Sequence, residues 1–452
     1  MATTFDRFIV PDFDHEQERL LQRDLRNMRR LVYLYFILLI CEGAIRKWLL
    51  PHLSGPILII RDPVVLLAYF LALRSRIFPW NIFVISGCLL GIASLAAGLF
   101  PSGSTLVVDL YGFRTDFLQI PFIFLMARVL RREDIVRLGS WVLLVTIPMA
   151  ILMLVQYLSP STAFINTVPG GVGEQIAAMG EHIRPPGPFS FITGVAEFFS
   201  LTTAFVLAST IYRHQYPLLL LLLAIGGLIL GTIVSISRLA LFSEAIVVAA
   251  FCIASLFHPG MIVKIVVITI FSGLLFLLFN KGGVTADAVD IFSQRVDAAN
   301  NFEEQTGTGT LTRVSLMFTE PLLFMEKIPW LGNGLGIGTN AGATLATGRA
   351  TTVEGEWARL VMESGPILGC ALIFWRIWLL GYLLRESFKL CLHGHVLPLL
   401  LWAATAQLLL IGQWGRPTTL GFCIFSAGLC LTTIGLLNRP PSVDGGDGTS
   451  TA

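Results

Sequence analysis

The chain has 452 residues, of which 55% are hydrophobic and 13% are charged, whereas an ordinary soluble domain is about 25% charged. With a mean hydropathy of +0.76, it has more apolar surface than one water-facing core can hold, which excludes a soluble single domain. The 31 Lys and Arg nearly balance the 29 Asp and Glu, so the basic face of a nucleic-acid-binding protein is not expected either. The composition predicts an all-α polytopic membrane protein, in which each helix needs about 20 apolar residues.

The chain contains seven cysteines, and nearly all of them lie in apolar stretches. Their positions show neither the paired spacing of a disulfide framework nor the spacing of metal ligands. We therefore expect no disulfide framework and no zinc site.

The first 30 residues are polar, and the first apolar stretch begins at Leu31 and is long enough to span a membrane. A cleavable signal peptide is therefore not expected here. Within residues 15–30, Leu21, Leu25 and Met28 recur at helical spacing among arginines. This pattern predicts either a short amphipathic helix on the membrane surface or a solvated basic segment.

Hydropathy predicts twelve transmembrane helices. Their approximate ranges are 31–50, 56–73, 80–100, 109–129, 138–158, 188–210, 216–236, 239–257, 261–280, 357–384, 396–413 and 417–437. Every second connection carries arginine or lysine, and the positive-inside rule then places both termini in the cytoplasm. We expect a cytoplasmic N-terminal segment (1–30), a single polytopic membrane domain (31–437) and a flexible cytoplasmic tail (438–452).

Two long connections, 159–187 and 281–356, fall on the opposite, outer side. The second has apolar residues at helical spacing around 289–296 and around 316–325, which predicts two amphipathic helices over the membrane surface. It also contains residues 328–338, in which glycine recurs at every second position. Such glycines allow close backbone approach to another surface, although a flexible loop is the alternative.

Ionisable groups inside membrane spans are costly and rare, and each is a candidate for function. Most of those in this chain fall in the outer halves of the predicted helices: Glu42, Arg46, Lys47, Arg61, Asp62, Asp109, Arg114, Asp116, Arg238 and Glu363. Glu42 and Arg46 lie at i and i+4, so a local ion pair is the simplest account of both. The same account covers Arg61 with the adjacent Asp62.

Arginine is well suited to hold phosphate, because its guanidinium presents two donors at once and stays charged near a membrane. Arg238, Arg313 and Arg416 have no acidic neighbour within one helical turn in sequence. Arg184 has only Glu181, in a predicted loop. These four arginines are candidates for binding an anionic ligand, and pairing with a distant carboxylate is the alternative.

Four short stretches follow one another along the predicted outer side. They read RPPGPF at 184–189, SISR at 235–238, PWLGNGLG at 329–336 and EGEWARLVMESGPILG at 354–369. In this order, on a twelve-helix protein with one large outer loop, they resemble the O-antigen ligase and O-antigen polymerase superfamily. The resemblance covers about residues 140–380 and does not extend to the N-terminal third.

The resemblance implies a helical membrane glycosyltransferase of the GT-C type in the inner membrane of a bacterium. Its donor would be a glycan linked to undecaprenyl diphosphate, which is transferred to an acceptor hydroxyl in cell-surface polysaccharide biosynthesis. The expected partners are this donor, an acceptor glycan or lipid, membrane lipids and other polysaccharide-assembly proteins, but no nucleic acid.

One feature departs from the family pattern. Members commonly carry a histidine near the start of the stretch that here begins at Glu354, and this chain has no histidine between His258 and His393. The resemblance therefore places Glu354 at the histidine position. A carboxylate can also act as a general base when it is within hydrogen-bond reach of the acceptor hydroxyl.

The resulting hypothesis is a metal-independent transfer. Arg184, Arg238 and Arg313 would hold the diphosphate and stabilise the charge that develops on it as it leaves. Glu354 or Glu356 would activate the acceptor hydroxyl.

Three further residues are secondary candidates for the same site: Arg114, Arg416 and Glu363. The predicted outer side contains no Asp-rich or His-rich cluster. We therefore expect neither a metal nor another cofactor.

Two other classes of protein fit the same sequence. In a transporter or flippase of lipid-linked sugars, Glu197 and Glu244 would be proton-relay groups, although each could equally be a carboxylate bonded to a neighbouring helix. No pair of internal half-repeats, which many transporters contain, is evident. A non-enzymatic membrane component of a polysaccharide assembly system is the third possibility.

Overall fold

The structure is a computed structural model, and it describes residues 15–99, 104–171, 182–212, 215–258, 310–325, 328–347 and 355–438. Shorter described pieces are residues 175, 177–179, 260, 273, 286–294 and 297.

Helices make up nearly all of the regular structure in these ranges. The α-helices are α1 (His15–Ala44), α2 (Asp62–Arg74), α3 (Ile82–Gly98), α4 (Leu106–Phe113), α5 (Ile120–Val129), α6 (Arg132–Leu158), α7 (Ile192–Ser209), α8 (Leu218–Ser235), α9 (Arg238–Phe257), α12 (Thr310–Phe324), α13 (Asn340–Thr347), α14 (Glu356–Leu392), α15 (Leu397–Leu410) and α16 (Pro417–Leu437). Short π- or 3-10-helical turns accompany them: η1 (Ile45–Leu49), η2 (Pro51–Leu53), η3 (Pro56–Ile59), η4 (Arg114–Leu118) and η5 (Phe164–Asn166). Two short strands, β1 (Ala177–Met179) and β2 (His182–Ile183), pair antiparallel.

Seven helical segments of the described chain are long and apolar enough to cross a membrane. They are Pro56–Arg74, Arg132–Leu158, Ile192–Ser209, Leu218–Ser235, Arg238–Phe257, Glu356–Leu392 and Pro417–Leu437. The chain is therefore a multi-pass helical membrane protein, as its composition predicts. Eleven of the twelve predicted spans coincide with helices, and the remaining one, 261–280, lies almost entirely outside the described residues.

Not every predicted span is a single long helix. The range 109–129 is divided among α4, η4 and α5, and Pro121 lies in the first turn of α5, where its missing N–H is tolerated. Helices α3 and α15 are apolar but have only 17 and 14 residues. Twelve crossings therefore stay a prediction.

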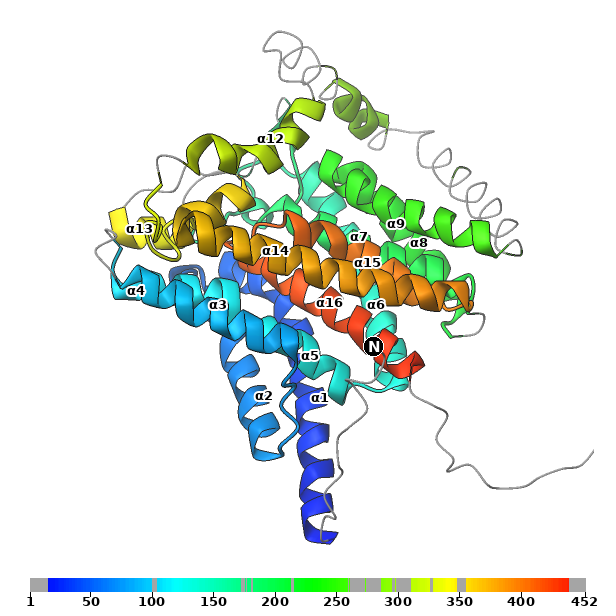
Figure 1. The fold of residues 1–452 in the computed structure, drawn as a ribbon. Coiled ribbons are helices and arrows are strands. Elements are labelled where there is room, and N and C mark those ends of the chain that lie inside the picture. The colour runs from blue at the N-terminus through cyan, green and yellow to red at the C-terminus, as the bar shows by residue number, and fades with distance from the viewer. Residues whose placement is uncertain are drawn as a thin grey trace, which may run out of the picture.

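The N-terminal segment differs from the prediction of a separate surface helix. Helix α1 runs without a break through residues 15–44, because no glycine or proline interrupts it before Gly43. Figure 1 shows its first turns extending beyond the other helices. Arg74 Nη2 donates to Asp24 Oδ1 at 2.6 Å and Ser75 Oγ donates to Asp24 Oδ2 at 2.6 Å, which ties this part of α1 to the end of α2.

Contacts join connections that are predicted to lie at the same end of the bundle. At the predicted inner end, the N–H of Val396 donates to the hydroxyl of Tyr212 at 3.1 Å. At the predicted outer end, Lys47 Nζ donates to the carbonyl oxygen of Gly187 at 2.6 Å. These pairs agree with the alternating course of the helices that the charge pattern predicts.

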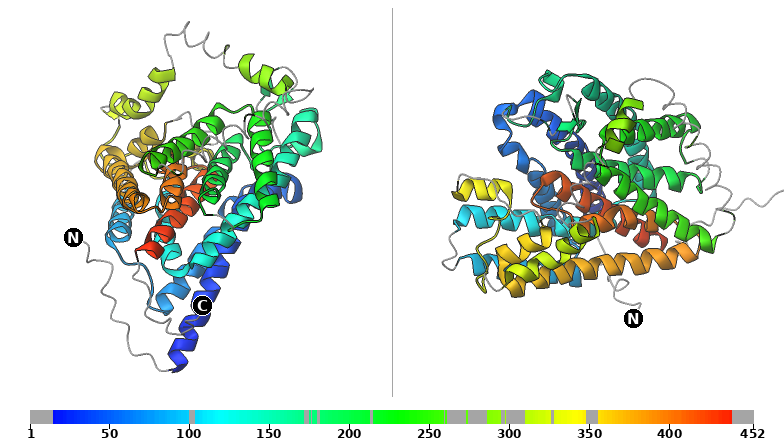
Figure 2. Two further views of the ribbon diagram at one scale, coloured as in Figure 1. Left: turned by 90° about the vertical axis from the view of Figure 1, so that its right-hand side faces the viewer. Right: turned by 90° about the horizontal axis from the view of Figure 1, so that it is seen from above.

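Helices α7 and α16 form the interior of the bundle. Their apolar windows are 89% and 83% buried, against 28% to 44% for the other five candidate spans. Seen from above in Figure 2, α16 (red) lies in the middle of the molecule and α14 (orange) runs along one edge. Polar residues on α7 and α16 are therefore enclosed by protein rather than facing lipid.

Helix α14 is interrupted in its N-terminal part. Pro366 has no N–H, and Gly365 before it has a φ of 78°, which lies outside helical geometry. The carbonyl of Met362 therefore lacks its usual partner within the helix. It accepts instead from the backbone N–H of Asn333 at 2.9 Å and from the side-chain amide of Asn333 at 3.2 Å.

The glycine-rich stretch 328–338 packs tightly against this interruption and against α4. A Cβ on Gly332 would lie 2.1 Å from the carbonyl oxygen of Glu363. A Cβ on Gly112 of α4 would lie 2.2 Å from the backbone nitrogen of Gly336. The predicted close backbone approach is confirmed, and this stretch is not a free loop.

Candidate functional site

Arg184 begins a tightly held turn that leads into α7. Pro185, Pro186 and Gly187 follow it, and all three are buried although they belong to no helix or strand. Gly187 has a φ of 58°, a conformation that favours glycine. Gln156 of α6 contacts Gly187 twice, since its Oε1 accepts from the N–H at 2.8 Å and its Nε2 donates to the carbonyl at 3.2 Å. The path of the chain after Arg184 is therefore fixed.

The turn η1, which directly follows α1, holds the same part of the chain. Lys47 Nζ donates to the carbonyl oxygen of Gly187 at 2.6 Å, and Arg46 Nη1 donates to Ser190 Oγ at 3.0 Å. The Lys47 side chain is fully enclosed, with 1% of the residue exposed. The N-terminal third, which lies outside the family resemblance, thus helps to shape the region that contains Arg184.

Arg238 lies in the first turn of α9. Helix α8 ends at Ser235, and Ile236 turns the chain with a φ of 47°. Ser237 then caps α9, because its hydroxyl accepts from the N–H of Ala240 at 3.3 Å. The N-terminus of a helix carries partial positive charge, to which the guanidinium of Arg238 adds.

Arg184 and Arg238 lie close enough for their charges to act on each other. Burial, followed by the positive charge of Arg238, lowers the pKa of Arg184. The Nε atom of Arg184 is buried and has no hydrogen-bond partner among the described residues. The charges of two of the three predicted phosphate-binding arginines therefore act on each other, and positive charge of this kind favours a bound anion.

Two predicted site residues cannot be placed relative to this pair. Arg313 belongs to α12, but its side chain is not among those described. Glu354 lies outside the described residues. The roles assigned to both from the sequence stay predictions.

Arg416 precedes α16, and Glu197 lies in the second turn of α7. Arg416 is exposed, its guanidinium carbon lies 5.7 Å from the ring centre of Phe191, and its charge acts on Glu197. Glu197 Oε1 accepts from Thr419 Oγ1 at 2.5 Å. Its other oxygen, Oε2, is buried without a hydrogen-bond partner in the described part of the chain. The interpretation of Glu197 as a carboxylate bonded to a neighbouring helix is confirmed.

A cluster of charges lies between α1, α2 and η4. Arg61 Nε is 3.1 Å from Glu42 Oε2, whereas Arg46 Nη1 is 3.9 Å from Glu42 Oε1. Arg114 Nε donates to Asp62. Glu42 is therefore closer to Arg61 than to Arg46, its predicted partner, and Asp62 pairs with Arg114 rather than with the adjacent Arg61. In both cases the closer partner comes from a different helix. The secondary candidate Arg114 is engaged in an internal ion pair.

The largest group of buried charges lies beneath the glycine-rich stretch and centres on Arg359. This residue is 4% exposed, and its guanidinium lies close to three carboxylates. They are Asp116 at 2.6 Å, Glu356 at 2.8 Å and Glu363 at 2.8 Å. Glu363 also accepts from the backbone N–H of Gly338 at 2.9 Å, which connects the cluster to the glycine-rich stretch.

Arg376 extends this group toward the interior. Its Nη1 lies 2.8 Å from Glu356 Oε1, but the two are not aligned for a hydrogen bond. Its guanidinium carbon lies 3.6 Å from the ring centre of Trp414, so it stacks on the indole. The backbone N–H of Trp414 donates to Glu356 Oε1 at 3.3 Å.

These contacts bear on the predicted roles of Glu356 and Glu363. Both oxygens of Glu356 and both of Glu363 accept hydrogen bonds, and Arg359 supplies a donor to each carboxylate. A carboxylate held by arginine loses ion-pair energy when it takes up a proton. The geometry therefore gives both residues a structural role, and their role in catalysis stays a prediction.

Arg376 is a buried charge that the site prediction missed, although the sequence contains a signal for it. It is the only charged residue in the apolar stretch 368–384, and a charge at such a position is a candidate by itself. The pairing of Arg359 with Asp116 had no such signal, because the two residues are 243 positions apart. Only the folded chain brings them together.

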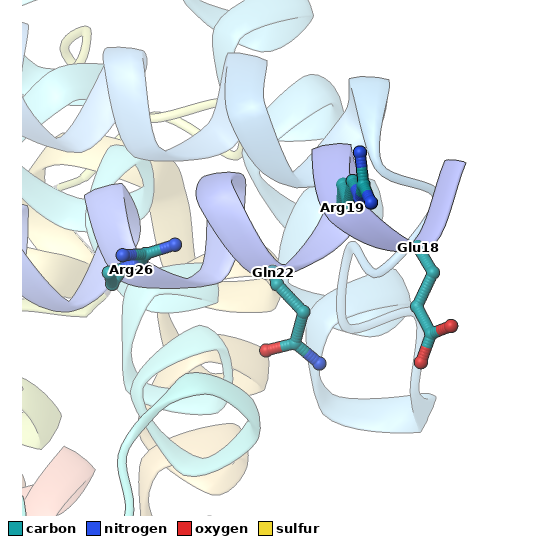
Figure 3. Close-up of a pocket in the computed structure, with 4 residues that line it drawn as sticks. All are labelled: Glu18, Arg19, Gln22 and Arg26. Atoms are coloured by element: carbon teal, nitrogen blue, oxygen red, sulfur yellow. The ribbon is translucent and has the colours of Figure 1, made fainter. Parts of the chain in front are cut away.

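A surface depression on α1 is separate from these clusters. Figure 3 shows the four side chains that line it, Glu18, Arg19, Gln22 and Arg26, and all come from the first turns of this helix. Glu18 and Gln22 point to one side of the helix and Arg19 points to the other. Because these groups do not converge, the depression is not a candidate active site.

Within the described ranges, no group of three or more His, Cys, Asp or Glu residues could hold a metal ion. Compared with models of known protein families and with curated proteins, the chain shows no match. The described chain is thus a polytopic helical membrane protein that contains several groups of buried ionisable side chains.

Proposed function

We propose that this protein is a glycosyltransferase of the O-antigen ligase or polymerase type in the inner membrane of a bacterium. It transfers or polymerises a glycan from undecaprenyl diphosphate onto an acceptor hydroxyl in cell-surface polysaccharide biosynthesis. The observation that supports this proposal best is Arg184, whose buried Nε atom has no hydrogen-bond partner among the described residues and whose pKa the positive charge of Arg238 lowers. A diphosphate leaving group needs positive charge that is already in place.

In the proposed reaction, the acceptor oxygen forms a bond to the anomeric carbon of the donor sugar. The bond between that carbon and the diphosphate oxygen breaks, and its electron pair goes to the diphosphate. Arg184 and Arg238 stabilise this charge, and the proton of the acceptor hydroxyl passes to a carboxylate. Removing one such preorganised donor typically costs roughly 10²- to 10³-fold in rate.

The orientation is part of the same proposal. The end of the bundle that contains Arg184 faces the periplasm, both termini are cytoplasmic, and the architecture is of the GT-C type. Support comes from the arginines of the connections at the opposite end. The packed glycine-rich stretch gives the outer end a fixed surface on which a large glycan can be positioned.

The test compares Arg184→Ala and Arg238→Ala with a matched control, Arg385→Ala. Arg385 is an exposed arginine, with a side chain 70% exposed, near the opposite end of α14. Membranes that contain equal amounts of each protein receive a labelled polyprenyl-diphosphate glycan. We expect product formation to fall about 100-fold or more in the first two variants and to be unchanged in the control. Unchanged product in Arg238→Ala would overturn the assignment of this residue.

Purified protein in lipid vesicles separates this proposal from the other two classes. A lengthened or transferred glycan supports the glycosyltransferase. Movement of the labelled donor across the bilayer without a new glycosidic bond supports a transporter instead. If neither outcome is observed, a non-enzymatic membrane component is the remaining class.

A further inference from the structure

The proposed transfer needs a carboxylate with an oxygen available for the acceptor proton. Most buried carboxylates of the described outer region fail this condition, because both of their oxygens already accept hydrogen bonds. They are Asp62, Asp116, Glu356 and Glu363. The two oxygens of Asp109 share the single hydroxyl proton of Ser104. In this region, only Glu42 and Glu197 have a buried carboxylate oxygen without a hydrogen-bond partner among the described residues.

Glu42 is the weaker of these two candidates. Its Oε2 lies 3.1 Å from Arg61 Nε, and its Oε1 lies 3.9 Å from Arg46 Nη1. Proton uptake would disrupt these ion pairs. The carboxylate of Glu197 accepts its hydrogen bond from a neutral hydroxyl, that of Thr419. This hydroxyl orients Oε1 without neutralising the carboxylate and leaves Oε2 for a second proton donor.

The position of Glu197 is also unusual. It lies in the second turn of α7, and Thr419 lies in the first turn of α16, the two most buried of the candidate spans. An ionisable side chain enclosed in a membrane bundle is costly and rare, so each one is a candidate for function even where it bonds to a neighbouring helix. A hydrogen bond between the two helices could be made by neutral side chains.

The chain segment from Arg184 to Glu197 connects this carboxylate to the proposed diphosphate site. Lys47 and Arg46 fix the turn after Arg184 through Gly187 and Ser190. The segment then enters α7, so the arginine and the carboxylate lie on one well-supported piece of backbone.

We propose that Glu197 accepts the proton of the acceptor hydroxyl, an inference that rests on the function proposed above. The hydroxyl proton moves to Glu197 Oε2 as the acceptor oxygen bonds to the anomeric carbon and the diphosphate departs with the bonding electron pair. Oε2 is covered in this structure. Access of an acceptor hydroxyl to Oε2 therefore requires a movement of neighbouring side chains.

The chain offers a matched control for this residue. Glu244 of α9 accepts from Thr232 Oγ1 of α8 at 2.8 Å. Like Glu197, it is therefore a glutamate bonded to a threonine of a neighbouring helix, which is one of the two interpretations that the sequence allowed. It is not part of the proposed site. Glu197→Gln and Glu244→Gln therefore make the same chemical change in similar local settings.

The experiment measures transfer from a labelled polyprenyl-diphosphate glycan by purified protein, together with photo-crosslinking of the labelled donor. We expect Glu197→Gln to lower kcat about 100-fold or more, with donor KM and donor crosslinking close to those of the unchanged protein. Glu197→Asp, which keeps the carboxylate, recovers part of kcat. Thr419→Val, which removes only the orienting hydroxyl, lowers kcat less, and Glu244→Gln has no effect.

Other outcomes overturn the inference. If Glu197→Gln retains kcat within about threefold, or loses donor crosslinking in parallel with kcat, Glu197 is not the proton acceptor. If Glu42→Gln loses kcat while Glu197→Gln does not, the role belongs to Glu42. If the unchanged protein forms no glycosidic bond, the proposed function itself fails and the role of Glu197 fails with it. Should Glu197→Gln not fold, Thr419→Val and Glu197→Asp decide the question.

Discussion

Lys47 donates from Nζ to the carbonyl oxygen of Gly187 at 2.6 Å, across 140 positions of sequence. The ammonium also lies 4.5 Å from the ring centre of Trp48. Since the residue is only 1% exposed, water contributes little to its solvation. The contact therefore fixes both the outer end of α1 and the turn that begins at Arg184, and it makes α1 part of the proposed donor site.

Replacing Lys47 with Met tests this connection. The variant keeps the apolar stem but removes the donor to Gly187, so the turn after Arg184 becomes less well fixed. We expect the free energy of unfolding to fall by about 1.5–3 kcal/mol, the typical value of a hydrogen bond to a charged group. Donor KM, measured by titration in the transfer assay, should rise. Lys389→Met, at an exposed site of α14, is the control, and an unchanged donor KM in Lys47→Met would contradict this role.

The packing of the glycine-rich stretch predicts a second effect. In Gly112→Ala, the new methyl group would lie 2.2 Å from the backbone nitrogen of Gly336, so either α4 or the stretch must shift. Such overpacking typically costs about 1–3 kcal/mol. Gly226→Ala in α8 is the matched control, because a methyl group added there would meet no atom within 4 Å. Melting temperatures in detergent should fall only for Gly112→Ala, and equal values for both variants would show that the contact is not tight.

The buried charges of α14 predict non-additive effects on stability. Arg376→Met removes a cation that lies 2.8 Å from Glu356, and breaking a buried pair typically costs roughly 3–5 kcal/mol. Glu356→Gln removes the other partner. Because neither single variant leaves the pair intact, the double variant should lose less stability than the sum of the two. Unfolding measurements on all four proteins give the coupling energy, and strict additivity would mean that the two residues do not interact.

The sequence predicts the helices better than it predicts their contacts. Apolar windows locate eleven of the twelve expected spans on helices, because the absence of water in a bilayer forces backbone groups to pair within each segment. The same argument gives no information on side-chain partners. Arg61 lies next to Asp62 in sequence and yet is 3.1 Å from Glu42, since the choice of partner depends on which helices meet.

The candidate site shows the same division. Arg184 and Arg238 were identifiable because each belongs to a distinctive local stretch and has few acidic neighbours in sequence. From the sequence, Lys47 is only one of several charged residues in the predicted outer halves of the helices. Its sequence neighbours do not indicate a contact with Gly187. The predicted span 357–384 contains Pro366 and yet includes no break, and the effect of that break, an acceptor for Asn333, depends on the position of a distant loop.

The proposed orientation predicts opposite labelling of two exposed positions. Leu345 of α13 is 61% exposed and lies at the proposed periplasmic end, whereas the Lys389 side chain of α14 is 51% exposed and lies at the proposed cytoplasmic end. Each is replaced by cysteine in a protein whose native cysteines have been removed. An impermeant thiol reagent added to spheroplasts, from which the outer membrane has been removed, should label Leu345→Cys. Lys389→Cys should react only after the inner membrane is opened, because no charged reagent crosses the hydrocarbon core. Labelling of both positions in intact spheroplasts would mean that α14 does not carry the chain from one side of the membrane to the other.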